Sequence, residues 1–517
     1  MMTARKKQPT AITLKQLMDG LCVSDYLPDI EISGLAIDSR KVKPGYAFIA
    51  LEGQREHGLA FAEAALNQGA VVVICDARFD QYCQQILSRI MSKVICVPVH
   101  NLQHKLGEIA NKFYDSASHK VFVCGITGTD GKTTVSHFIA QTLQQAEGGA
   151  AVIGTIGNGP LEKMEQATHT TPDVISLHEM IRDYYQQGVK SISMEVSSHG
   201  LDQQRVAAID FDVAVLTNLS RDHLDYHGSI EAYRESKKKL FTEADSHALV
   251  INADDAFGME LYEELKNGKQ IWLYGLHKDR ARQSELYAWA ENIETEVQGL
   301  RFRLCSSQGT AELSVQLIGE FNIYNLLACF CVLMQKGINF NHAIRYLEKL
   351  SAVTGRMELI TLTDLPAVVI DFAHTPAALS EALKNVRKHV KARLICVFGC
   401  GGDRDAGKRP LMAQAAEAQA DLLIITSDNP RTENPAQIIE QIEQGISDKQ
   451  KVLIEVDREK AIQQAIQQAN VDDIVLIAGK GHEQYQLLGD RKIPFSDRAV
   501  ALKYLAKDTL DQSGVDK

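Results

Sequence analysis

Short β-branched and apolar runs alternate with helical patterns along almost the whole chain. Such alternation indicates βα units and largely parallel sheets, because parallel neighbours must be joined by a crossover connection. The strand-like runs are Val71–Cys75, Val94–Val99, Lys120–Cys124, Ser191–Val196, Val213–Thr217, Ala248–Asn252, Ala367–Asp371, Arg393–Phe398, Asp421–Thr426, Val452–Val456 and Asp473–Ala478. The sequence therefore predicts an α/β protein.

The length of the chain predicts several domains. A chain of 517 residues, 45% of them hydrophobic, is too long for one core and fits roughly two to four domains. The strand-like runs fall into three blocks, and the third opens after the loop Ser351–Gly355. We therefore expect domains at residues 1–103, 104–351 and 352–517.

Charge and hydropathy exclude several classes of protein. The formal net charge of -11 argues against nucleic acid as the main partner. No apolar run approaches the ~18 residues of a membrane span, and no apolar segment follows the basic N-terminal residues as in a signal peptide. The scattered cysteines include no C-x-x-C pair, so we expect reduced thiols in a cytoplasmic protein, with Cys329 and Cys331 packed in an apolar helix.

A glycine-rich segment lies between a strand-like run and the helical pattern Val135–Gln145. It reads Gly125-Ile-Thr-Gly-Thr-Asp-Gly-Lys-Thr-Thr134. Glycines let backbone N–H groups approach phosphates, a lysine reaches the β- and γ-phosphates, and a threonine hydroxyl ligates Mg²⁺. This context favours a phosphate loop over a chance glycine turn, although the spacing departs from the usual pattern. The predicted nucleotide-binding residues are Gly125, Thr127, Gly128, Thr129, Asp130, Gly131, Lys132, Thr133 and Thr134.

Two later motifs support a metal ion near the nucleotide. Met194–Gly200 follows a strand-like run and places Glu195 at its carboxyl end, where ligands gather in α/β sheets and where a carboxylate suits Mg²⁺. Thr217–His227 also follows such a run. The spacing of His223 and His227 could suggest zinc, but no H-E-x-x-H motif is present. A nucleotide-linked cation near His223 is therefore the favoured reading.

These three motifs, in this order, resemble the Mur ligases. The resemblance covers nearly the whole chain. It continues through Asp38–Arg40, Gly355–Glu358, Asp371–Pro376, Gly399–Pro410, Asp428–Arg431 and Gly479–Glu483.

The resemblance implies a fold and a reaction. The implied fold has an N-terminal UDP-binding α/β domain, a central P-loop-type ATPase domain and a C-terminal Rossmann-like domain. The implied enzyme is a cytoplasmic ligase of peptidoglycan precursor synthesis that needs ATP and Mg²⁺. It would add meso-2,6-diaminopimelate to UDP-N-acetylmuramoyl-L-alanyl-D-glutamate through an acyl phosphate. We expect it to act as a monomer.

The resemblance also implies site residues. Those for the UDP-linked substrate are Ile37, Ser39, Gln54, Arg55, Glu56, Thr170, Thr171, Ser197, Gln203 and Arg205. Those for the adenosine part of ATP are Asn322, Asn325, Arg356 and Asp371. Those for diaminopimelate are Arg404, Asp428, Asn429, Pro430, Arg431, Gly479 and Glu483. The implied catalytic residues are Lys132, Lys237, Glu195 and His223. The implied metal ligands are Thr133, Glu195, His223 and Lys237, the last as a carbamate (N6-carboxylysine).

Simpler explanations compete at some of these positions. Asp428–Arg431 could be an ordinary turn after a strand. Asn322 and Asn325 have the spacing of a polar helix face. Glu483 and Arg404 could form an exposed ion pair, and Lys237 lies in a basic run typical of a solvated helix.

Three other functions remain as alternatives. A sister ligase that adds lysine is disfavoured by Arg431, because a second carboxylate needs a guanidinium whereas an ammonium is repelled by it. A folylpolyglutamate-type ligase is disfavoured by the N-terminal block around Asp38–Arg40. A nucleotide-dependent switch or binding protein would not need the arginines of the third block.

Overall fold

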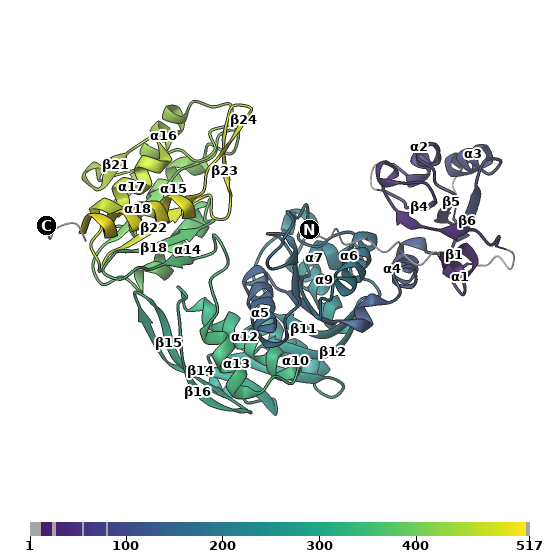
Figure 1. Cartoon of the computed structure of the whole chain (residues 1–517), viewed down its shortest axis with the longest axis horizontal. Coiled ribbons are helices and arrows are strands. Elements are labelled where there is room, and N and C mark those ends of the chain that lie inside the picture. The colour runs from purple at the N-terminus through teal and green to yellow at the C-terminus, as the bar shows by residue number, and fades with distance from the viewer. Residues whose placement is uncertain (1–11, 23–26, 54–55, 79–80, 513–517) are drawn as a thin grey trace. The chain divides into compact units, whose positions relative to one another are not determined.

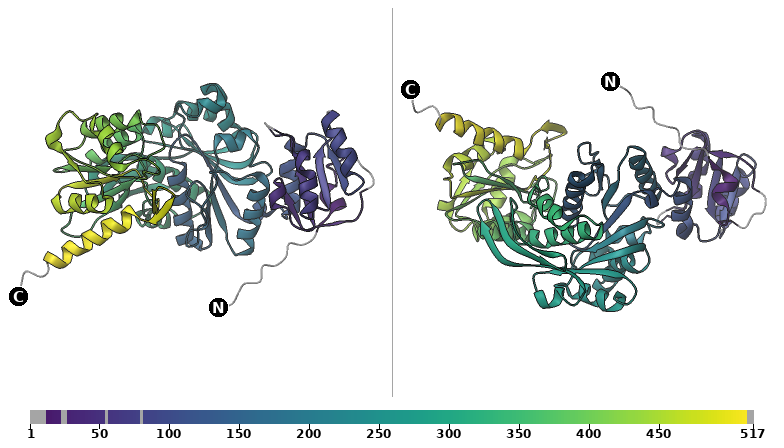
Figure 2. Two further views of the ribbon diagram at one scale, coloured as in Figure 1. Left: turned by 90° about the horizontal axis from the view of Figure 1, so that it is seen from above. Right: turned by 60° about the horizontal axis from the view of Figure 1, so that its bottom comes forward.

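The computed structural model describes residues 12–22, 27–53, 56–78 and 81–512 (Figures 1 and 2). The chain divides into two compact units. The first holds the described residues up to Lys132, together with Glu147–Leu249 and Glu260–Gln270. The second holds Thr133–Ala146, Val250–Met259 and the described residues from Ile271 onward. The limits expected for three domains remain predictions.

A four-stranded parallel sheet, purple in Figure 1, lies near the start of the chain and has the order β3-β4-β5-β6. Its strands are β3 (Gly34–Ala36), β4 (Tyr46–Ala50), β5 (Val72–Asp76) and β6 (Ile95–Val99). Val72 and Ile74 pack with α1 (Leu14–Met18) and α4 (Leu102–Phe113), whereas Val73 and Cys75 pack with α2 (Ala62–Asn67) and α3 (Gln81–Ile90). Since successive side chains of a strand point to opposite faces, the sheet has a core on each side.

The central sheet has ten strands in the order β16-β15-β14-β13-β12-β11-β7-β10-β8-β9. The strands are β7 (Phe122–Thr127), β8 (Ala150–Ile153), β9 (Asn158–Pro160), β10 (Ser191–Glu195), β11 (Asp210–Leu216), β12 (Asp245–Asn252), β13 (Gln270–Gly275), β14 (Leu286–Glu296), β15 (Gly299–Ser306) and β16 (Gly309–Val315). Strands β10, β7 and β11 run parallel, as predicted, and so does β8, which the sequence analysis did not identify. Strands β14, β15 and β16 form an antiparallel meander that the sequence analysis did not anticipate.

Helices connect and flank these strands. They are α5 (Lys132–Glu147), α6 (Val174–Gln186), α7 (Ser198–Asp202), α8 (Leu224–His227), α9 (Ile230–Thr242), α10 (Ala256–Leu265), α11 (Lys278–Ala281), α12 (Phe321–Gln335) and α13 (Phe340–Glu348). Cys329 and Cys331 are 0% exposed in α12, which confirms the prediction that they pack in an apolar helix.

The third sheet has the order β17-β18-β22-β19-β20-β21, and only its edge strand β17 is antiparallel. Its strands are β17 (Glu358–Ile360), β18 (Ala367–Asp371), β19 (Leu394–Phe398), β20 (Leu422–Ile425), β21 (Val452–Ile454) and β22 (Ile474–Ala478). The five parallel strands were all predicted to within a few residues. Their carboxyl ends lie along one edge, where α/β sheets gather ligands.

Helices cover both faces of this third sheet. Helices α14 (Pro376–Arg387), α15 (Lys408–Glu417) and α16 (Pro435–Glu443) pack on one face, and α17 (Arg458–Gln468) and α18 (Asp497–Gln512) on the other. Helices α14 and α16 begin with proline after the caps Thr375 and Asn434, which accept hydrogen bonds from backbone N–H groups. Proline suits the first helical position because the N–H it lacks would have no partner there.

A short antiparallel hairpin, β23 (Tyr485–Leu488) and β24 (Arg491–Pro494), precedes α18. None of the helices in the described part of the chain combines the length and the apolar run that crossing a membrane requires.

We expect Phe398→Ala to weaken the third sheet. Phe398 is 0% exposed on β19, between β22 and β20. Truncation of a buried phenylalanine costs about 3–5 kcal/mol, because it removes apolar burial and leaves a cavity. Native-state hydrogen exchange should show this loss in the opening free energy of the β19 and β22 amides. Leu411→Ala, at a residue 50% exposed on α15, is the control, and equal protection in the two variants would contradict the expectation.

Candidate active site

The predicted phosphate loop lies between β7 and α5, in the strand–loop–helix arrangement that the sequence analysis expected. Gly128 has a φ of 149°, and a Cβ on it would lie 1.8 Å from Thr217 Oγ1. Only glycine therefore fits. The backbone N–H of Asp130 donates to Asn218 Oδ1 at 2.9 Å, and that of Thr129 donates to Asn218 O at 2.9 Å. The segment after β11 thus holds the loop in place, while the side chain of Asp130 is exposed.

Two lysines converge on one carbonyl of this loop. Lys132 Nζ donates to Gly128 O at 2.9 Å and to Thr129 O at 2.9 Å. Lys237 Nζ donates to the same Gly128 O at 2.6 Å and lies 4.5 Å from the centre of the Tyr233 ring. Helix α9 delivers Lys237, and its cap Ser229 accepts a hydrogen bond from the N–H of Ala232.

Lys237 is 1% exposed, so the interpretation of this position as part of a solvated basic face is wrong. Burial lowers the pKa of Lys237 to about 6, and repulsion from Lys132 acts in the same direction. Asp222 and Asp130 oppose this shift in the pKa without cancelling it. The side chain is therefore largely a neutral amine at neutral pH, which makes it nucleophilic.

Glu195 ends β10 and is 1% exposed. Its Oε1 accepts a hydrogen bond from Thr155 N at 2.7 Å, and its Oε2 accepts one from Thr155 Oγ1 at 3.1 Å. A Cβ on Gly154 would lie 2.3 Å from Glu195 Oε1. The carboxylate is thus held in one orientation by residues that the sequence analysis did not single out.

Five residues predicted to bind the UDP-linked substrate join this network. Thr170 Oγ1 lies 3.0 Å from Thr155 Oγ1, and Thr171 Oγ1 donates to Glu195 O at 3.0 Å. Ser197 N donates to Thr171 Oγ1 at 3.0 Å. Arg205 donates to Thr171 O at 2.8 Å, and its Nε and Nη2 donate to Gln203 Oε1 at 3.0 and 2.6 Å. The structure therefore brings Thr170, Thr171, Ser197, Gln203 and Arg205 together beside Glu195.

His223 belongs to an aromatic cluster. Its side chain is 48% exposed, its backbone is left-handed with a φ of 50°, and its Nε2 lies 3.4 Å from Asp222 Oδ2. Its ring centre is 5.1 Å from that of His199, which in turn lies 4.1 Å from Tyr226. Burial lowers the pKa of His199 and of His227. The sequence analysis did not single out His199 or Tyr226, although each lies inside one of its motifs.

Two of the predicted uridine-binding residues, Ile37 and Ser39, follow β3 of the N-terminal sheet. Ile37 packs against the core, and Ser39 opens the short 3-10 helix Ser39–Lys41. Asp38 caps this helix and forms an ion pair of 2.8 Å with Arg40. Glu56 is exposed, whereas Gln54 and Arg55 lie outside the described residues.

The adenosine-site predictions fall on two places in the second unit. Asn322 and Asn325 are 3% and 6% exposed, so the interpretation as a polar surface face is wrong. Asn322 Nδ2 donates to Ile318 O at 2.8 Å, and Asn325 Nδ2 donates to Asn322 Oδ1 at 2.9 Å. Amides this deep in an apolar helix persist only when they are hydrogen-bonded.

Arg356 and Asp371 lie close together at the end of β18. The Arg356 guanidinium lies 5.1 Å from the centre of the Phe372 ring. Its Nε has no hydrogen-bond acceptor among the described residues. Asp371 Oδ2 accepts from Met357 N at 2.8 Å, and burial raises the pKa of this carboxyl group.

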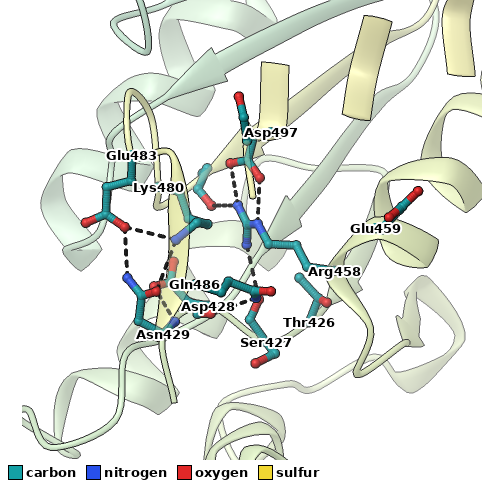
Figure 3. Close-up of polar contacts among 12 residues, drawn as sticks. Thr426, Ser427, Asp428, Asn429, Arg458, Glu459, Lys480, Glu483, Gln486 and Asp497 are labelled. Atoms are coloured by element: carbon teal, nitrogen blue, oxygen red, sulfur yellow. Dashed lines mark hydrogen bonds and ion pairs between the residues drawn. The ribbon is translucent and has the colours of Figure 1, made fainter. Parts of the chain in front are cut away.

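Figure 3 shows Asp428, Asn429 and Glu483, three of the residues predicted to bind diaminopimelate, beyond the carboxyl ends of β20 and β22. Asn429 Nδ2 donates to Glu483 Oε2 at 2.8 Å. Burial raises the pKa of Asp428. A Cβ on Gly479 would lie 2.7 Å from Asp428 Oδ2, so the carboxylate occupies the space that a larger residue would need. Glu483 pairs with Lys480 at 2.9 Å, so the expected alternative of an ion pair with Arg404 is wrong.

The two arginines predicted for this site differ in how firmly other residues hold them. Arg431 has a left-handed backbone with a φ of 51°, and its Nη1 donates to Gly402 O at 2.7 Å. Its N–H donates to Leu487 O at 3.0 Å, and Pro430 before it is buried. Arg404, by contrast, is exposed.

Sequence profiles of one family match all three blocks of the chain. The profile described as Mur ligase family, catalytic domain, matches residues 31–114. The Mur ligase middle domain matches residues 126–333, and the Mur ligase glutamate ligase domain matches residues 355–481.

Individual relatives extend this similarity. The UDP-N-acetylmuramoyl-L-alanyl-D-glutamate--2,6-diaminopimelate ligase of Coxiella burnetii is 44% identical over 92% of this chain and 96% of its own. The protein of the same name from Haemophilus influenzae strain Rd is 42% identical over 92% of this chain and 97% of its own. A solved structure bearing that name has a TM-score of 0.76 and 36% identity, with 97% of this chain and all of the other covered.

These matches confirm the expected three-domain α/β architecture. Identity above 40% over nine-tenths of the chain and three successive profile matches lead to one assignment. The chain belongs to the Mur ligase family.

Proposed function

We propose that this protein is the ATP-dependent ligase that adds meso-2,6-diaminopimelate to UDP-N-acetylmuramoyl-L-alanyl-D-glutamate. The observation that carries this proposal is the 44% identity, over 92% of the chain, to a ligase whose name states that reaction. We infer that it works as a monomer in the cytoplasm, where the nucleotide-linked precursors of peptidoglycan are made.

In the proposed reaction, the γ-phosphoryl group of ATP passes to the D-glutamyl carboxylate of the substrate. The amine of diaminopimelate then attacks the acyl phosphate, an amide forms and inorganic phosphate leaves. Lys132 would release the carbonyls of Gly128 and Thr129 and pair with the transferring phosphoryl oxygens. The N–H groups of residues 128–134 and the start of α5 would hold the remaining phosphate charge. The cluster around Thr171 and Arg205 would orient the dipeptide.

The donor set suits Mg²⁺. The Glu195 carboxylate is fixed by two hydrogen bonds from Thr155, the Thr133 hydroxyl follows Lys132 in the loop, and a carbamate on Lys237 would add an oxygen anion. All three are hard oxygen donors of the kind that Mg²⁺ prefers. When bound, the ion neutralises phosphate charge in the transition state. His223 would lie beside the bound ion, as the resemblance to the Mur ligases implies.

The choice of amino acid depends on the third sheet. Diaminopimelate differs from lysine by one additional carboxylate at its far end. Arg431, fixed by its contacts to Gly402 and Leu487, would bind that carboxylate. Lysine would leave this guanidinium unpaired, and such a loss is the strongest source of discrimination in polar sites.

A product analysis tests the proposal and separates it from the alternatives. The protein is incubated with ATP, Mg²⁺ and the UDP-dipeptide, and meso-diaminopimelate, lysine or glutamate is added in separate reactions. We expect a mass increase in the nucleotide product with diaminopimelate alone. Product with lysine would support the sister ligase, and phosphate release without any amide product would support a nucleotide-dependent switch.

We expect Lys132→Ala to lower kcat by at least a hundredfold in a folded protein, because it removes the only lysine that reaches the phosphoryl group from the loop. Phosphate release measures this loss, and circular dichroism checks folding. Lys266→Ala, at an ion pair outside the site, should leave the rate unchanged. Near-normal turnover by folded Lys132→Ala would overturn the role of the loop.

We expect Lys237→Ala to lose most activity and acetate to restore part of it, because acetate can supply the carboxylate of the missing carbamate. The reaction with CO₂ requires the neutral amine, which predominates above the pKa of about 6. Turnover is measured with and without added acetate. Lys238→Ala, at the neighbouring residue, which pairs with Glu264, is the control and should show no response to acetate. Full activity of Lys237→Ala without added acetate would exclude the carbamate.

We expect Arg431→Ala to reduce kcat/KM for diaminopimelate tenfold to a hundredfold, because one charge-assisted hydrogen bond is worth roughly 1.5–3 kcal/mol. The KM for the UDP-dipeptide should change little. Arg301→Ala, at an exposed pair with Glu296, should match the wild type in both constants. A parallel loss for both substrates would contradict a specific role for Arg431.

A further inference from the structure

Two cations, Lys480 and Arg458, lie behind the residues predicted to bind the amino acid (Figure 3). The side chain of Lys480 is 0% exposed and that of Arg458 is 1% exposed. Neither can reach a substrate directly. A buried cation is retained only where partners compensate its lost hydration, so the partners of these side chains indicate what they do.

Lys480 bonds to two residues of the predicted site. Its Nζ donates to Asn429 Oδ1 at 3.1 Å and to Glu483 Oε2 at 2.9 Å. It also lies 5.7 Å from the centre of the Tyr485 ring, within the range of a cation–π contact. The ammonium group thus connects the segment after β20 to the segment after β22.

These bonds fix the side-chain amide of Asn429. Its Oδ1 accepts from Lys480 Nζ and also from Leu487 N at 3.0 Å, while its Nδ2 donates to Glu483 Oε2 at 2.8 Å. Because both donors face Oδ1, a flipped amide would place N–H against N–H. Asn429 can therefore offer only its second N–H to a ligand, and that group suits a carboxylate.

The same bonds fix the carboxylate of Glu483. Its Oε2 accepts from both Lys480 and Asn429. Its Oε1 has no donor among the described residues, points away from Lys480 in Figure 3, and belongs to a side chain that is 23% exposed. Glu483 therefore presents one ionised oxygen that suits an ammonium group.

Arg458 holds the backbone at the ends of β20 and β22, behind Asn429 and Glu483. It forms a buried ion pair with Asp497 at 2.7 Å. It also donates to Ser427 O at 3.4 Å, just beyond β20, and to Ala478 O at 3.1 Å, at the last residue of β22. Arg458 pairs with Asp497 and Lys480 pairs with Glu483, which leaves neither of these cations as the ion-pair partner of Asp428. Burial raises the pKa of the Asp428 carboxyl group, and a substrate ammonium group beside it would favour its ionised form.

We propose that Lys480 is a positioning residue for the amino-acid substrate and acts through Asn429 and Glu483. It sets them to bind an amino-acid head group, in which an ammonium and a carboxylate lie side by side. The inference rests on the proposed function in one respect: diaminopimelate has such a group at its distal end, whereas lysine has an ammonium alone. A purely structural ion pair would stabilise the fold without favouring one substrate.

Steady-state kinetics of Lys480→Met test the proposal, with each of the three substrates varied in turn. Methionine keeps the length and apolar character of the side chain and removes the charge. We expect the KM for diaminopimelate to rise at least tenfold, while the KM values for ATP and the UDP-dipeptide stay within twofold of the wild type. Lys384→Met is the control, because Lys384 also pairs with a glutamate three residues away but is 52% exposed. It should leave all three constants unchanged.

A double-mutant cycle tests whether Lys480 acts through Glu483. Glu483→Gln should raise the KM for diaminopimelate, and Lys480→Met/Glu483→Gln should match that single variant within twofold. The double variant also removes both charges of the pair together, so it keeps the test available if Lys480→Met alone does not fold. Effects that multiply would overturn the proposal. An equal change in all three KM values, or lower thermal stability with unchanged KM values, would overturn it as well.

A failure of the role proposed for Lys480 can be distinguished from a failure of the proposed function. If the wild-type protein makes no diaminopimelate product, the proposed function fails, and the variants are then measured with the amino acid that is incorporated. If the wild-type protein makes that product and Lys480→Met retains its KM for diaminopimelate, only the role of Lys480 fails.

Discussion

The buried hydrogen bond from Lys237 to the carbonyl of Gly128 is the interaction on which the proposed phosphate site depends. A cation in such a place loses most of its hydration, and the lowered pKa of about 6 follows from this loss. The loop can approach Thr217 and Asn218 only because Gly128 has no side chain. The loop after β7 is held by the hydrogen bond from Lys237 and by its bonds to the segment after β11, the strand beside β7 in the sheet.

In our proposal, buried cations also order the site on the third sheet, which would bind a different ligand. The carboxyl ends of its parallel strands place Asp371, Asp428 and Gly479 along one edge. Buried cations behind that edge keep its carboxylates and amides in one orientation. Polar groups in such a setting are pre-ordered before substrate binds, so less of the binding free energy is lost in ordering them.

The sequence analysis located the parallel strands and the phosphate loop because hydrophobic runs and glycine spacing are local signals. It could not distinguish a buried lysine from a solvated one: Lys237 meets Gly128 across 109 residues, and its neighbours in the chain are polar. The contact between Lys480 and Asn429, which are 51 residues apart in the chain, could not be predicted for the same reason. The antiparallel meander of β14, β15 and β16 escaped notice because its alternating pattern lies within a chain dominated by parallel units.

The central claim is that this protein activates a carboxylate as an acyl phosphate. The UDP-dipeptide is labelled with ¹⁸O in the D-glutamyl carboxylate, and the phosphate released during amide formation is analysed by mass spectrometry. Our account predicts one ¹⁸O atom in each phosphate, because the carboxylate oxygen that attacks ATP leaves with the phosphoryl group. Unlabelled phosphate formed together with the amide product would contradict it.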